Sequence, residues 1–295
     1  MAPTETDAPT LAAKANASDR DERLDPPQLL ASSVLAQRVA VAVIAIPIIF
    51  LLILVGGDWY VAFVAAVLAV ASLEFERPRL GWLSPLAVLA AVFSAAMAGG
   101  AHVGYNWVLW FAAGAALLSL VLSVATFDVE RSLIDWMWTL GAVIYVGFLG
   151  AFIVLLRDVH DGRDWVYLTV FSTFAVDTAA YFTGRAIGRH KLAPAISPGK
   201  TIEGFLGGWA GGIAAVVLLN YFLGLRIDAG QIALLAVVFP VAAALGDLAE
   251  SAIKRGMQIK DASELIPGHG GALDRLDSIL FTFPLVYLFL QWVVY

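Results

Sequence analysis

Two pairs of carboxylates in the C-terminal part of the chain are the residues best suited to carry out chemistry. Asp247 and Glu250 stand three residues apart, a spacing that places both side chains on one face of a helix. Asp274 and Asp277 repeat this spacing, provided that the last helix starts near Leu273. Carboxylates held this close repel one another, and a divalent cation removes that conflict. Mg²⁺ typically binds one or two carboxylates and completes its coordination with water and substrate phosphates.

Basic side chains lie near both pairs and supply charge for binding phosphate groups. They are Lys254, Arg255, Lys260 and Arg275. The chain between the two pairs also contains a glycine-rich run with a histidine, made of Gly268, His269, Gly270 and Gly271. This combination predicts a site that holds a divalent cation and a polyphosphate together.

Each of these residues also has a structural interpretation, and the sequence leaves it open. Asp247 could be a helix-end acid that pairs with Lys254 or Arg255. Asp274 could cap the N-terminus of the last helix, a place that suits Asp. His269 could be a structural hydrogen-bond donor, and Lys254 and Arg255 could be ordinary charges at a membrane surface.

The loop over residues 185–203 is a second candidate for phosphate binding. It combines glycines, whose backbone N–H groups can approach an anion, with basic side chains. Its Ser197 to Thr201 run is not a P-loop, because the first glycine of that motif is missing and no strand is predicted before it. The structural alternative is a basic anchor that touches anionic lipid head groups. The glycines and bases are Gly184, Gly188, Gly199, Arg185, Arg189, Lys191 and Lys200.

Further acids lie within or at the ends of apolar stretches. Asp177 falls inside one, with Tyr181 one turn further on, and an acid within a membrane span is a functional candidate. The alternative for Asp177 is a hydrogen bond to a neighbouring helix. Glu74, Glu76 and Asp135 lie near helix ends, and we interpret them as ordinary boundary carboxylates.

The elements that must position these residues are membrane helices. Of the 295 residues, 60% are hydrophobic and 14% are charged, whereas soluble domains carry about 25% charged residues. The absence of cysteine excludes disulfide scaffolds and thiolate metal sites, and the net charge of -6 argues against a nucleic-acid-binding protein. Residues 1–30 are acidic and proline-rich, which predicts a disordered cytoplasmic tail before a membrane domain over residues 31–295.

Nine apolar stretches follow the tail, and they do not alternate as barrel strands would. They predict an all-α integral membrane protein with about nine transmembrane helices. The stretches cover residues 36–56, 59–76, 82–100, 106–126, 134–156, 165–184, 204–224, 230–250 and 276–295.

The distribution of lysine and arginine predicts the orientation of these spans. With the N-terminus in the cytoplasm, fifteen basic residues fall in inside segments and three, Arg157, Arg163 and Arg226, in outside loops. The candidate site then faces the cytoplasm from the C-terminal half of a multi-pass protein in the cell membrane.

The candidate residues carry a resemblance to a known family. The stretch from Ser251 to Asp277 reads SAIKRGMQIKDASELIPGHGGALDRLD and resembles the signature of the phosphatidate cytidylyltransferases, or CDP-diacylglycerol synthases. The Asp177 to Arg185 and Ser197 to Gly204 runs also resemble that family, so the resemblance covers about residues 170–278. Two positions depart from it: Ala272 stands where a larger aliphatic residue is usual, and Gly199 where a second lysine is common.

The resemblance implies transfer of CMP from CTP to phosphatidate, which gives CDP-diacylglycerol and pyrophosphate for phospholipid biosynthesis. It implies Mg²⁺ as the cofactor, with room for a second cation, and assigns the metal to Asp247, Asp274 and Glu250. The other residues that it assigns to catalysis are Lys254, Arg255, Lys260 and Asp277. Those that it assigns to substrate binding are Ser197, Lys200, Thr201, Asp177, Tyr181, His269, Gly270, Gly271 and Arg275.

Several further expectations follow from the resemblance and the topology. Phosphatidate should enter sideways from the inner leaflet, between helices. The family is usually dimeric, and the glycines from Gly207 to Gly212 would permit a close helix contact between copies or within one chain. Two alternative functions are transfer from CTP to another lipid phosphate, and ion-coupled transport. Transport is disfavoured because we find no internal repeat and the polar groups gather at one face. A non-catalytic membrane scaffold is disfavoured because nothing structural demands so many acids and bases together.

Overall fold

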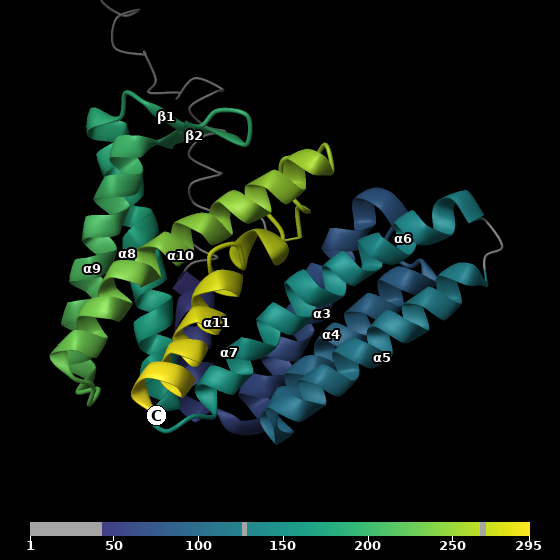
Figure 1. Cartoon of the computed structure of the whole chain (residues 1–295), viewed down its shortest axis with the longest axis horizontal. Coiled ribbons are helices and arrows are strands. Elements are labelled where there is room, and N and C mark those ends of the chain that lie inside the picture. Colours follow the sequence, from purple (N-terminus) through teal and green to yellow (C-terminus); the bar gives the residue numbers. More distant parts are fainter. Residues whose placement is uncertain (1–42, 126–128, 266–269) are drawn as a thin grey trace, which may run out of the picture.

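The computed structural model of the chain describes residues 43–125, 129–265 and 270–295, and Figure 1 shows it as a mostly helical protein. The tail over residues 1–30 and His269 lie outside the described residues. Each of the nine predicted apolar stretches overlaps a helical segment. The prediction of an all-α membrane protein is confirmed at this level, with one small exception described below.

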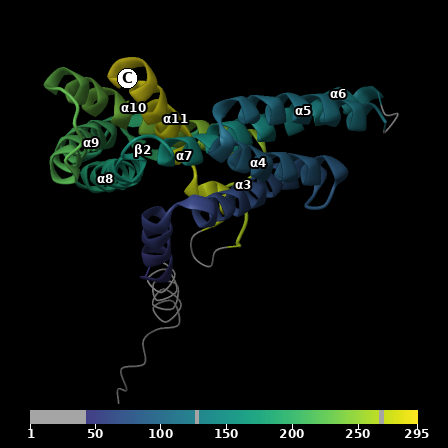
Figure 2. The same cartoon turned by 90° about the horizontal axis from the view of Figure 1, so that it is seen from below.

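The N-terminal half is a group of helices that pack side by side. A helical segment, Val43–Val55, leads into α3 (Gly57–Leu80), α4 (Pro85–Val103) and α5 (Tyr105–Val124). The fifth apolar stretch forms α6 (Val129–Ala142), a π-helical turn η1 (Val143–Phe148) and α7 (Leu149–Arg157). In Figure 2 the Val43–Val55 segment extends away from the other helices, and most of its side chains are exposed.

The C-terminal half contains the long helices α8 (Gly162–Ile187), α9 (Ile202–Leu223) and α10 (Ala229–Gly256). After α10 the chain forms a 3₁₀ turn, η2 (Leu273–Arg275), and then α11 (Ile279–Phe289), which continues into a π-helical end, η3 (Leu290–Val294). α11 packs between the two halves, where Tyr287 meets Phe152 of α7 edge to face with ring centroids 5.4 Å apart.

Six described helices are long and apolar enough to cross a membrane, judged by length and composition. They are α3, α4, α5, the continuous helix Glu130–Arg157, α9 and α10. Val43–Val55 and Ile279–Val294 are apolar but shorter, and α8 is not among the six. The count of nine spans therefore stays a prediction.

The glycines of α9 serve packing within the chain. A Cβ on Gly207 would lie 2.2 Å from the hydroxyl oxygen of Thr183, and one on Gly211 would lie 2.5 Å from the Cβ of Ala179, so α9 contacts α8 almost backbone to backbone. Gly212 approaches Pro240 of α10 in the same way. The contacts of these glycines with α8 and α10 thus explain the small residues without a second copy of the protein.

One segment differs in kind from the prediction. Part of the 185–203 loop forms an antiparallel hairpin of β1 (Lys191–Ala193) and β2 (Ser197–Thr201), which lies over one end of α8 and α9 in Figure 1. A period-two pattern is missing from this segment of the sequence, because Pro198 and Gly199 occupy the second strand. The hairpin joins α8 to α9 and carries Lys200 toward α10.

Candidate active site

The end of α10 presents an ion cluster centred on Lys254. The ammonium nitrogen of Lys254 lies 2.9 Å from Oε1 of Glu250, one turn earlier on the same helix. It also lies 2.8 Å from Oδ1 of Asp274 in η2. Both carboxylates are buried, so the lysine ammonium pairs with two acids that solvent does not reach. The interpretation of Lys254 as a surface charge is therefore wrong.

Asp274 is held by the loop before it and not by the start of a helix. Its Oδ2 accepts hydrogen bonds from the backbone N–H of Ala262 at 2.9 Å and of Gly271 at 2.8 Å. Burial alone raises the pKa of the Asp274 carboxyl, but the hydrogen bonds from Lys254 and these N–H groups bring that pKa below its usual value. Because α11 begins only at Ile279, the interpretation of Asp274 as its N-cap is wrong.

Asp277 lies near Asp247 because α10 and the start of α11 approach closely. A Cβ on Gly246 would lie 2.7 Å from the carbonyl oxygen of Asp277, so a larger residue at this point would push the two segments apart. Asp277 is partly buried, and the Asp247 carboxylate is one of its electrostatic neighbours. Since η2 and a turn precede α11, Asp274 and Asp277 do not share the helix face that the sequence suggested. Two acids nevertheless come together, an arrangement that a cation would stabilise.

The hairpin brings Lys200 to this acidic region. Nζ of Lys200 lies 2.5 Å from Oδ2 of Asp247, so Asp247 pairs with a base from the hairpin and not with the bases at the end of its own helix. The next residue, Thr201, accepts a hydrogen bond from the N–H of Gly204 at 3.1 Å and so caps α9. The cap fixes the point where β2 turns into α9, one residue after Lys200.

Two further contacts anchor the hairpin. The carboxylate of Glu203 accepts a hydrogen bond from the backbone N–H of Arg189 at 3.0 Å and lies 2.5 Å from Nδ1 of His190. At the other end, Nε of Arg255 donates to the carbonyl oxygen of Ile196 at 3.3 Å. Arg255 thus connects the tip of the hairpin to the end of α10.

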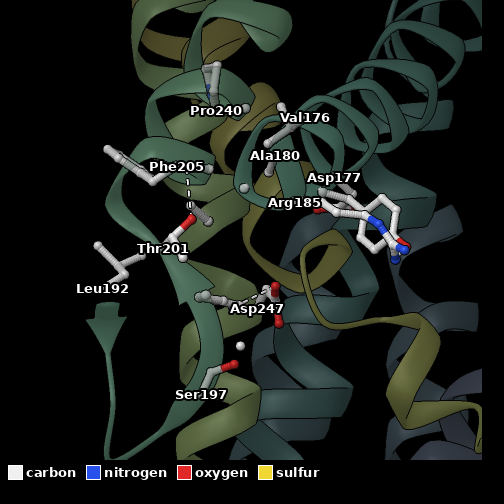
Figure 3. A pocket seen from close by; sticks show the side chains of 17 residues that line it. Val176, Asp177, Ala180, Arg185, Leu192, Ser197, Thr201, Phe205, Pro240 and Asp247 are labelled. Carbon is white, nitrogen blue, oxygen red and sulfur yellow. Dashed lines mark hydrogen bonds and ion pairs between the residues drawn. The ribbon is translucent and has the colours of Figure 1, made fainter. Parts of the chain in front are cut away.

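A cavity of about 530 Å³ lies between α8, α9, α10 and the hairpin, and Figure 3 shows its lining. Asp177, Ser197, Lys200 and Asp247 contribute polar groups to it. In Figure 3, Pro240 and Phe205 lie at the far side of the cavity from Ser197. The cavity therefore combines a charged end with an apolar wall, whose residues include Val176, Ala180, Phe205, Pro240 and Ala244.

Two glycines let the chain turn back over buried carboxylates. Gly270 has a φ of 79°, and a Cβ there would lie 2.7 Å from Oδ2 of Asp274. A Cβ on Gly271 would lie 2.5 Å from both carboxylate oxygens of Glu74 on α3. The glycine-rich run is thus fitted to two acids, one from each half of the molecule.

The model of a cytidylyltransferase family matches residues 36–293, which is most of the chain. The chain belongs to the cytidylyltransferase family. A phosphatidate cytidylyltransferase of Staphylococcus aureus is 32% identical over 257 residues, which are 86% of this chain and 98% of the relative. Phosphatidate cytidylyltransferases of Staphylococcus epidermidis and Staphylococcus haemolyticus are 37% and 35% identical over 176 residues, 59% of this chain and 67% of each relative.

The other predicted residues that the structure of this cytidylyltransferase describes line the cavity or are exposed. Tyr181 lines the cavity with Asp177 and Ser197, and its hydroxyl oxygen accepts a hydrogen bond from Arg185 at 3.1 Å. Lys260 and Arg275 are exposed, so both are accessible to a charged substrate. The roles of all these residues in catalysis stay predictions.

The carboxylates that were predicted to bind a metal lie in two places. Within the described residues, no three His, Asp or Glu side chains stand close enough to hold an ion by themselves. The predicted ligands are instead divided, Asp247 beside Lys200 and the pair Glu250 and Asp274 beside Lys254. Oε2 of Glu250 is buried and has no hydrogen-bond partner in the described part of the chain. These donors fit a Mg²⁺ ion that takes its remaining ligands from substrate phosphates and water.

Two residues of the N-terminal half lie near the residues of the site and were not predicted to do so: Glu74 contacts the loop before Asp274, and Tyr145 has site acids as electrostatic neighbours. Glu74 is fully buried, and the interpretation of it as an ordinary boundary carboxylate is wrong. The Tyr145 hydroxyl, in the π-helical turn η1, is buried without a hydrogen-bond partner among the described residues, and its electrostatic neighbours are Glu250, Asp277 and Asp247. Asp135, in contrast, pairs with Arg79 at 2.7 Å at the surface, as a boundary acid would.

Proposed function

We propose that the protein transfers CMP from CTP to phosphatidate and releases pyrophosphate, a step in phospholipid biosynthesis. The observation that carries this proposal is the cavity that places Asp177, Lys200 and Asp247 beside an apolar wall, in a chain of the cytidylyltransferase family. A lipid phosphate needs both surfaces, because its head group is charged and its tails are not. The similarity to proteins named phosphatidate cytidylyltransferase supports this substrate.

In the proposed reaction an oxygen of the phosphatidate phosphate attacks the α-phosphorus of CTP. The bond between that phosphorus and the oxygen that bridges to the β-phosphate breaks, and pyrophosphate leaves. The nucleophile is already an anion at neutral pH, so the protein needs no strong base. Its main tasks are to position two anions in line and to neutralise their charge.

The side chains of the cluster are suited to these tasks. Lys200 and Lys254 place positive charge beside the acids, and Arg255, Lys260 and Arg275 add further positive charge. Asp247, Asp274 and Glu250 would hold Mg²⁺, and the extra carboxylate of Asp277 leaves room for a second cation. Bound Mg²⁺ supplies neutralisation of the triphosphate and polarisation of the reacting phosphoryl group.

We infer that the site lies at the cytoplasmic border of the membrane, in a chain of nine spans with a cytoplasmic N-terminus. The bias of basic residues supports this orientation. The length of α10 supports the position of the site at the border of the bilayer. Asp247 lies about 27 Å along the helix from Ala229, and the hydrocarbon core of a bilayer is about 30 Å thick. Phosphatidate would then enter from the inner leaflet along the apolar wall of the cavity. A homodimer remains part of the proposal, with an interface away from the α9 glycines.

The test is a purified protein in detergent with labelled CTP and phosphatidate. We expect a lipid-soluble cytidine product and an equal amount of pyrophosphate. A parallel reaction with an isoprenoid phosphate tests the alternative acceptor. Product from the isoprenoid phosphate and none from phosphatidate would replace the proposal by that alternative, and no product from either would refute both.

A further inference from the structure

A buried acid of α3 binds the loop that ends in the active site. The Glu74 side chain is fully buried, and its Oε2 accepts a hydrogen bond from the N–H of Leu273 at 2.7 Å. Its Oε1 accepts hydrogen bonds from the N–H of Ala272 at 3.1 Å and from the hydroxyl of Ser263 at 2.5 Å. Glu74 therefore joins two parts of the loop, one before and one after the glycine-rich run.

The contacts of Glu74 alternate along the loop with those of Asp274. Asp274 accepts from the N–H groups of residues 262 and 271, and Glu74 accepts from groups of residues 263, 272 and 273. On each side of the loop the two acids thus bind neighbouring residues. If Glu74 loses its contacts with the loop, the neighbouring N–H groups that bind Asp274 are therefore no longer fixed in place.

The same helix holds the loop at another point, one turn after Glu74. The Nη1 atom of Arg77 donates to the carbonyl oxygen of Ala262 at 3.2 Å. The N–H of this residue is one of the two that hold Asp274. The end of α3 thus fixes the backbone on which the Asp274 carboxylate depends.

We propose that Glu74 is a positioning residue of the active site, which sets the placement of Asp274 through the 262–273 loop. The inference rests on the proposed function, because it takes Asp274 as a group of the reacting site. Glu74 comes from the N-terminal half of the chain, so the N-terminal helices contribute to the site through this acid. It does not touch substrate in this account and acts only through the loop.

The test compares Glu74→Gln with a matched control, Glu76→Gln. Glu76 lies on the same helix and is equally buried, but no hydrogen bond between described residues joins it to the 262–273 loop. In Glu74→Gln an amide NH₂ group replaces one of the two carboxylate oxygens. In one orientation of the amide this group faces the N–H of Leu273, and in the other it faces the donors of Ala272 and Ser263. At least one contact therefore becomes donor to donor. We expect kcat to fall by about 10-fold to 100-fold, the cost of a small displacement of reacting groups, with KM for CTP changed much less.

A second readout does not depend on turnover. Hydrogen–deuterium exchange in detergent should show faster exchange of the backbone between residues 262 and 274 in Glu74→Gln and unchanged exchange there in Glu76→Gln. The milder variant Ser263→Ala removes one contact of Glu74, together with the hydrogen bond that the Ser263 hydroxyl accepts from the N–H of Leu265, and leaves Glu74 in place. It serves if Glu74→Gln does not fold. It should show a smaller change of the same kind in both readouts.

The outcomes separate this inference from the proposed function. Wild-type protein without activity toward CTP and phosphatidate refutes the proposed function, and exchange in the loop still decides whether Glu74 holds it. Active wild type with unchanged kcat and unchanged loop exchange in Glu74→Gln overturns the inference alone. Equal losses of kcat in Glu74→Gln and Glu76→Gln would also overturn it, since both would then reflect a lost buried acid and not the loop.

Discussion

Replacement of Lys254 by methionine is the strongest single perturbation of the ion cluster, because this one side chain forms ion pairs with two buried acids. Methionine keeps the length of the apolar stem and removes the charge. Glu250 and Asp274 then lose the ammonium that lies 2.9 Å and 2.8 Å from their oxygens. Removal of one partner from a buried ion pair costs about 3–5 kcal/mol. The Lys254 side chain is 17% exposed, and partial solvation favours the lower end of that range.

The assay is thermal unfolding of the purified protein in detergent, beside turnover of CTP and phosphatidate. We expect Lys254→Met to lower the free energy of unfolding by about 3 kcal/mol and to abolish turnover. The triple variant Lys254→Met, Glu250→Gln, Asp274→Asn removes all three charges, so it should regain most of the lost stability and remain inactive. Lys260→Met serves as the stability control, because Lys260 is exposed and surface changes usually stay within about 0.5 kcal/mol.

The reasoning would be refuted if Lys254→Met unfolded at the same temperature as the wild type. It would also be refuted if the triple variant were less stable than Lys254→Met. Either result would mean that the lysine does not neutralise the two acids in the folded protein.

Two further predictions concern substrate and metal. Lys200→Met should raise KM for CTP by about 10-fold or more, the value of a charge-assisted hydrogen bond, and normal kinetics would remove Lys200 from the phosphate ligands. EDTA should stop turnover and added Mg²⁺ should restore it, since the carboxylates suit a hard cation, and turnover that is indifferent to chelation would contradict the metal assignment.

The sequence predicted the positions of the helices well, because apolar runs of about twenty residues are a local signal. It also predicted a group of acids and bases near the ends of the last two helices, where these residues are close in sequence, and their role in the chemistry stays a prediction. The short acid spacing was interpreted correctly for Asp247 and Glu250, which lie on one long helix. The same reasoning was wrong for Asp274 and Asp277, because Asp274 lies in a 3₁₀ turn and α11 starts only after Asp277.

Contacts between distant segments could not be predicted from local patterns. Glu74 binds a residue 198 positions away along the chain, and no periodicity connects the two. The pairing of Lys200 with Asp247 depends on the hairpin. Its second strand contains Pro198 and Gly199 and therefore lacks the alternating pattern by which a strand is predicted. Likewise, the π-helical turn at Tyr145 shifts the face of its helix in a way that a regular 3.6-residue period does not show.

The most direct test of the whole account is the turnover of Asp274→Asn, measured on protein that is folded and purified in detergent. Asparagine keeps the shape of the side chain and an acceptor for the backbone N–H groups, but it removes the charge that Lys254 and a cation would meet. We expect a loss of at least about 100-fold in kcat with CTP, phosphatidate and Mg²⁺, the scale for loss of an electrostatic group at a reacting centre. A rate close to that of the wild type would contradict it.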